Sequence, residues 1–199
     1  MTKTTAALVT LLLASLPGTA MAHGHNQPDN PGPYSGFQTR EIKSLSNDDI
    51  AEIRRGGGWG LALPAELSGR PGPAHLLELR NEIGLSADQV AKVEKLFGKM
   101  REEAIEAGER FITAEAALSR AFEDPGLDRE HLGELLDDAA TARAELRFVH
   151  LSRHLATTDI LSAAQIQTYN FLRGYAEDPC ARTPDGHDPE LWRQHNGCG

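Results

Sequence analysis

The chain has 199 residues, a formal net charge of -9 at pH 7 and 40% hydrophobic residues. This acidity disfavours nucleic acid as a partner, because the phosphate backbone attracts basic proteins. The length is ordinary for one domain with its own core, and no apolar run after the first residues is long enough for stable membrane insertion.

The first residues have the pattern of a secretory signal peptide. Lys3 supplies a positive start, residues 6–16 an apolar segment, and "AMA" at 20–22 a small-residue cleavage site. We therefore expect residues 1–22 to be removed and a soluble mature chain to begin at His23 in the bacterial periplasm.

Helical patterns dominate the rest of the chain. After a flexible leader at 23–44, apolar residues recur every three or four positions from Ser86 to about Phe122 and from Asp128 to about Thr158. The link "EDPGLD" is so short that the two helices should lie antiparallel as a hairpin. We predict an all-α fold with this long antiparallel helical hairpin, together with short N-terminal and C-terminal helices, in a domain at 45–175.

The second long segment carries apolar residues on two sides. Leu146 lies at the centre of the inward stripe, and His150 and His154 lie at its margin. A second stripe of Phe148, Leu151 and Leu155 lies nearly opposite. We expect the short N-terminal helices to cover it.

Two motifs mark helix starts. "LSADQ" and "LSAAQ" each place a serine at the N-cap and a glutamine three residues later, which is the pattern of a capping box. The six motif residues are Leu85, Ser86, Gln89, Leu161, Ser162 and Gln165.

Two L-[ST]-x-x-Q motifs at helix starts in a small exported helical chain resemble the LTXXQ family. This family includes Spy/CpxP periplasmic stress proteins and the related zinc-resistance-associated and CnrX-type metal-sensing proteins, and the resemblance covers about Leu45 to Tyr175. It implies a curved hairpin, often a homodimer, that acts as an ATP-independent chaperone, a stress-signal inhibitor or a metal sensor. Its partners would be unfolded periplasmic proteins or a membrane sensor protein. The net acidity is a departure, because a Spy-like cradle is expected to be basic on its concave side.

Histidines suggest a transition-metal site. His150 and His154 are four residues apart on one helix face, and a hairpin could bring His75 and Glu78 to the same end. Such a set suits Zn, Ni, Co or Cu. The alternative is a pair of histidines in a helix seam, hydrogen-bonded to carboxylates such as Glu78.

The expected mature N-terminus offers a separate metal site. A free amine followed by His23, Gly24 and His25 can enclose Cu(II) or Ni(II) in a square-planar set of nitrogens. This site needs no fold, but it does need cleavage after residue 22.

Cys180 and Cys198 are the only two cysteines. In an oxidising compartment they favour a disulfide that closes a C-terminal tail at 176–199. The alternative is a zinc site that also uses His187 and His195.

No motif indicates an enzyme. "HLSRH" has Leu151 where a zinc protease needs a glutamate, and "RRGGGWG" lacks the Lys-Ser/Thr ending of a phosphate-binding loop. We therefore expect a non-enzymatic Spy/CpxP-like stress-response protein, chaperone-like or regulatory, that binds a transition metal. The alternative is a CnrX-type heavy-metal sensor or resistance protein that signals to a membrane partner.

Overall fold

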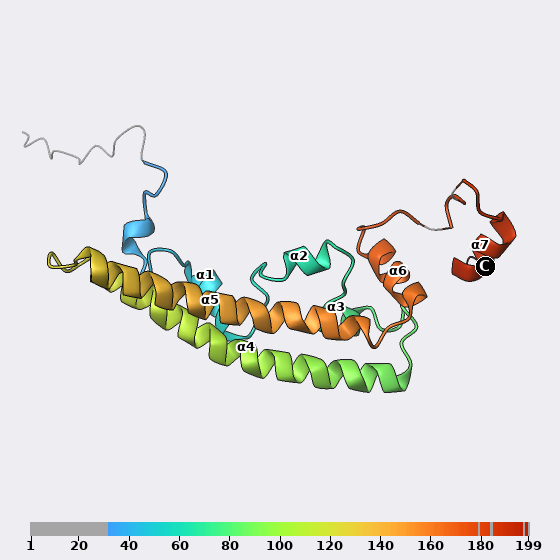
Figure 1. Cartoon of the computed structure of the whole chain (residues 1–199), viewed down its shortest axis with the longest axis horizontal. Helices are drawn as coiled ribbons and strands as arrows, with labels where there is room; N and C mark the ends of the chain where they lie inside the picture. Colours follow the sequence, from blue (N-terminus) through green and yellow to red (C-terminus); the bar gives the residue numbers. More distant parts are fainter. Residues whose placement is uncertain (1–31, 179, 184, 197, 199) are drawn as a thin grey trace, which may run out of the picture. The chain divides into compact units, whose positions relative to one another are not determined.

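The computed structural model describes residues 32–178, 180–183, 185–196 and 198 (Figure 1). Within this part every regular element is helical, which confirms the all-α class. The elements are η1 (Phe37–Thr39), α1 (Asn47–Arg54), α2 (Leu63–Glu66), α3 (Pro73–Glu78), α4 (Ala87–Ala121), α5 (Arg129–Thr158), α6 (Ala163–Leu172) and α7 (Pro189–Asn196). The predicted signal peptide, His23 and His25 lie outside the described residues.

The two long helices α4 and α5 pack against each other and are joined by a short turn (Figure 1). Their ends lie almost where the apolar periodicity placed them. Two ion pairs connect them, Arg153 with Glu103 and Arg110 with Glu145, the latter at 3.0 Å. Arg153, late in α5, thus pairs with Glu103, early in α4, whereas Glu145, earlier in α5, pairs with Arg110, later in α4.

The main core lies where α1 packs on the long pair. Its buried members include Ile53 of α1, Phe111 of α4 and Leu146 of α5. Helix α1 can approach α4 closely because position 108 is glycine. A Cβ built there would lie 2.6 Å from Cγ2 of Ile53, which is too close for any real contact. A second cluster joins α3, α4 and α6 through Leu76, Val93 and Tyr169, together with Ile83 of the α3–α4 turn.

The end of the predicted leader belongs to the main core, the one that contains Phe111. Ile42 is 2% exposed, and the backbone N–H of Lys43 donates to Oγ of Ser119 at 3.2 Å. The prediction of a flexible leader through residue 44 is therefore wrong for its last residues. Ile42 is followed by Leu45 at an interval of three, but one such interval is too short to indicate a helical repeat.

Helix α5 was predicted to be covered on two faces. The buried inward face is confirmed, and the cover of the outer face is not. Leu146, His150 and His154 are 1%, 3% and 7% exposed, so the inward face buries both histidines. On the opposite face, Phe148 is 72% and Leu155 is 55% exposed. Leu151 is partly covered, but the short helices in the described part leave the rest of this face open, because α1 and α3 pack mainly against α4.

The C-terminal tail carries the predicted disulfide. Cys180 and Cys198 are bonded, with their Cα atoms 5.5 Å apart. The pairing excludes the alternative zinc site, and His187 instead packs edge-on against Trp192. Among the described residues, no helix combines the length and apolar character that spanning a bilayer requires.

Candidate functional site

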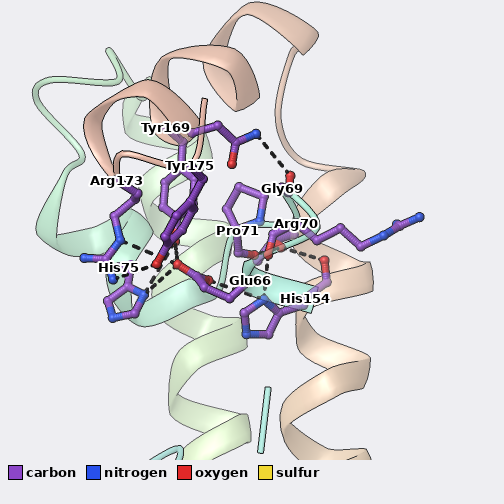
Figure 2. A network of polar contacts seen from close by, with 11 residues as sticks. Glu66, Gly69, Arg70, Pro71, His75, His154, Tyr169, Arg173 and Tyr175 are labelled. Carbon is purple, nitrogen blue, oxygen red and sulfur yellow. Dashed lines mark hydrogen bonds and ion pairs between the residues drawn. The ribbon is translucent and has the colours of Figure 1, made fainter. Parts of the chain in front are cut away.

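A buried carboxylate organises one end of the long helix pair. Glu66 ends the short helix α2, which starts at a proline-containing first turn, and its side chain is 7% exposed. Its Oε1 accepts a hydrogen bond from the Tyr169 hydroxyl and contacts Nδ1 of His75 at 3.2 Å (Figure 2). Nε of Arg173 lies 3.6 Å from the same oxygen. One carboxylate thus connects α2 with α3, α6 and the residues that follow α6.

Helix α5 joins this network through His154. Its Nδ1 lies 2.7 Å from the carbonyl oxygen of Arg70 and 3.8 Å from Oε2 of Glu66. A carbonyl can only accept, so Nδ1 carries a proton and the neutral ring has its lone pair on Nε2. Figure 2 shows this second ring nitrogen pointing away from Arg70. One turn later, the Thr157 hydroxyl donates to the carbonyl of Pro71.

His150 is the exception in this polar cluster. It is 3% exposed, and its Nε2 has no hydrogen-bond partner among the described residues. Burial lowers the pKa of His150 below its usual value, and neighbouring His154 lowers it further, while Glu52 acts in the opposite direction. The neutral ring is therefore the favoured form at neutral pH.

The electrostatics of Glu66 favour its charged form. Burial raises the pKa of Glu66, but the hydrogen bonds from His75 and Tyr169 outweigh this effect, so the pKa lies below its usual value. Burial and the adjacent carboxylate raise the pKa of Tyr169 far above its usual value, so the phenol keeps its proton. The ionised carboxylate and the neutral phenol thus make a charge-assisted hydrogen bond.

Beside this network lies a cleft of about 490 Å³. Its apolar walls come from the segment between α1 and α2, from α2 and from α4, and they include Trp59, Leu63, Phe97 and Met100. Its polar end is formed by Glu66, His75, His150 and His154. Trp59 adopts a positive φ of 43°, a conformation that is uncommon for a residue with a side chain.

The structure brings together three of the four residues predicted to hold a metal. His75 and His154 both contact Glu66, and His150 lines the same cleft. Glu78 is exposed and is not among the residues that line the cleft. In the part of the chain that the structure describes, no three His, Cys, Asp or Glu side chains are arranged to hold a metal ion. The set present therefore does not fit the predicted four-ligand centre.

Three residues of this network were missed by sequence reasoning. Glu66, Tyr169 and Arg173 lie in short helices or turns that lack a long periodic pattern. The one available signal for Glu66 is an acidic residue inside the apolar run "LALPAEL". It is weak because isolated acidic residues are common at the surface.

The two motif glutamines contact each other. Both predicted capping boxes are present, at Ser86 with Gln89 and at Ser162 with Gln165. Nε2 of Gln89 donates to Oε1 of Gln165 at 2.8 Å, and Nε2 of Gln165 donates back to Oε1 of Gln89 at 3.0 Å. The motifs therefore cap α4 and α6 and also join the two helix starts.

We expect Gln89→Ala and Gln165→Ala each to lower the free energy of unfolding by about 1–2 kcal/mol, because each loses a cap and the shared amide pair. The double variant should lose less than the sum, since either single change already breaks the pair. Urea denaturation of the four proteins measures this coupling. The matched control is Gln167→Ala, at an exposed position of α6. Strictly additive losses would contradict the pairing.

Comparisons of the chain with models of protein families, with curated proteins and with solved structures give no significant match. The resemblance to the LTXXQ family stays a prediction that rests on the two motifs.

Proposed function

We propose that this chain is an exported, non-enzymatic helical binding protein of the Spy/CpxP type, in which α4 and α5 form an antiparallel hairpin. It acts without ATP and holds apolar segments of unfolded periplasmic proteins. One observation carries the proposal: most of an apolar stripe along the outer face of α5 is exposed. The paired capping motifs support the family assignment.

The stripe follows the helical repeat. At 100° per residue, Ala140, Ala144, Phe148, Leu151 and Leu155 fall within one arc of α5, on the side opposite Leu146. We call these five residues the α5 stripe. Two of its large side chains are among the more exposed apolar side chains of the described part, at 72% for Phe148 and 55% for Leu155.

Exposed apolar side chains in a continuous row favour association more than scattered ones do. Complete burial of one large apolar side chain contributes about 1.5–3 kcal/mol, so several contacts along the stripe can hold a client weakly and reversibly. Arg147 and Glu145 adjoin the stripe along α5 and are exposed. Charges of both signs at the rim keep the row soluble and assist encounter.

The test is suppression of client aggregation. The mature protein at several-fold excess should keep a thermally unfolding client in solution without ATP, and Phe148→Ser with Leu155→Ser should remove most of this effect. Because both side chains are exposed, the double variant should melt within a few degrees of the parent. Phe122→Ser is the matched control, since Phe122 is 67% exposed but lies after α4. Equal suppression by parent and double variant would exclude the α5 stripe.

The alternative of a CnrX-type heavy-metal sensor stays a prediction. His75, His150 and His154 line one cleft, whereas the fourth predicted ligand, Glu78, is exposed. A membrane sensor protein or a second copy of the chain could occupy the α5 stripe in place of a client.

A further inference from the structure

We propose that the cleft beside Glu66 binds a small organic amine, with its ammonium group at the polar end and an aliphatic or aromatic body between the apolar walls. This inference goes beyond the proposed function and does not depend on it, because the cleft and the α5 stripe use different residues.

The size and lining of the cleft are those of a small-molecule site. Such sites usually measure 300–1,000 Å³ and have apolar walls with a few convergent polar groups. The cleft of about 490 Å³ falls inside this range. Trp59, Phe97 and Met100 offer aromatic and thioether surface to the body of a ligand, and an aromatic face also attracts a cation.

The polar end includes two buried polar atoms that lack hydrogen-bond partners in the described residues. Oε2 of Glu66 and Nε2 of His150 are both buried, and neither has a hydrogen-bond partner among the described residues. The two residues are 5% and 3% exposed. Leaving such groups unpaired is unfavourable, so a ligand that supplies the missing hydrogen bonds gains affinity from them.

His154 adds a third acceptor. Its Nδ1 donates to the carbonyl of Arg70, which leaves the lone pair on Nε2. Gly72 borders this nitrogen, and a Cβ built at Gly72 would lie 2.8 Å from it. A side chain at position 72 would collide with the ring, so the glycine allows His154 to take its place at the cleft.

These acceptors select the chemical class of the ligand. A carboxylate oxygen and a histidine lone pair both require a donor, His150 can accept in one neutral tautomer, and an ammonium group offers three N–H donors with a positive charge. An anionic head would meet Glu66 directly. The two arginines of the lining, Arg55 and Arg101, are exposed and thus belong to the outer part of the cleft.

The experiment compares three probes of one shape. Phenylbutylamine, phenylbutanol and phenylbutyrate share an apolar body and differ in the head group. Calorimetry at pH 8 in the presence of a chelator should show saturable binding of the amine, at least about tenfold weaker binding of the alcohol, and none of the carboxylate. Equal binding of amine and alcohol, or no binding of the amine at millimolar concentration, would overturn the proposal.

Variants locate the site. His150→Leu replaces the ring with an apolar side chain of similar reach and removes its nitrogens. Glu66→Gln removes the charge with little change in shape. Each variant should weaken amine binding about tenfold or more. Both variants are first shown to be folded by circular dichroism, and His150→Leu keeps the test valid if Glu66→Gln unfolds. His131→Leu is the control, because His131 lies at the exposed start of α5. Unchanged affinity in His150→Leu, or binding that appears only after a metal ion is added, would refute the amine site.

Discussion

Glu66→Ala is expected to lower the free energy of unfolding by about 3–5 kcal/mol, because it removes one partner from a buried charged network. The change leaves the Tyr169 hydroxyl and the His75 ring without their shared acceptor, and Arg173 without its counter-charge. It also opens a small cavity where α2, α3 and α6 meet. Urea denaturation followed by circular dichroism measures the loss.

Glu78→Ala is the matched control for this prediction. Glu78 is a glutamate at the end of α3, but it is exposed, so its removal should change the stability by no more than about 0.5 kcal/mol. Glu66→Gln should fall between the two, because the amide oxygen still accepts from Tyr169 while the ion pairs are lost. If Glu66→Ala costs no more than Glu78→Ala, the carboxylate does not organise this end of the molecule.

His150→Leu is expected to stabilise the protein, and increasingly so as the pH falls. The pKa of His150 is lowered in the folded state by burial, so below its ordinary value of 6.5 the unfolded chain binds more protons than the folded chain. Stability present above that pH is therefore lost on acidification. The variant removes both this loss and the unpartnered Nε2. Its free energy of unfolding should therefore exceed that of the parent by about 1–3 kcal/mol at pH 5–6. Melting temperatures between pH 8 and pH 5 test it.

The control for the pH series is His131→Leu, which alters a histidine that is 58% exposed and should leave the slope of the parent unchanged. A second loss belongs to Glu66, whose pKa lies below its ordinary value of 4.5. Its contribution is present above that value and disappears at lower pH, so the two losses are separated along the pH axis. Identical pH slopes in parent and His150→Leu would contradict the buried neutral histidine.

The long helices could be predicted because their signals are local. Apolar residues at intervals of three and four, such as Val93, Met100 and Phe111, fix the face of α4 that becomes buried. The serine caps at Ser86 and Ser162 fix two starts within one residue. Local periodicity does not specify what covers each face, so the inward face of α5 was predicted correctly and the cover of its outer face was not.

The polar network could be predicted only in part because it is not local. His75 and His154 were placed at a common end of the helix pair, and both contact one carboxylate. That carboxylate is Glu66, 103 positions from Tyr169 in the sequence, and no spacing rule relates them. Glu78 was chosen because it follows His75 by about one turn. Yet α3 buries Leu76, which turns Glu78 towards solvent.

The most direct test of the proposed binding function is site-specific photocrosslinking to an unfolding client. A photoreactive phenylalanine analogue in place of Phe148 lies in the α5 stripe, and the same analogue in place of Phe122 lies after α4 at a similar exposure. We predict that the first captures the unfolding client but not the folded one, and that the second captures neither. Equal capture from both positions, or none from Phe148, would contradict client binding by the α5 stripe.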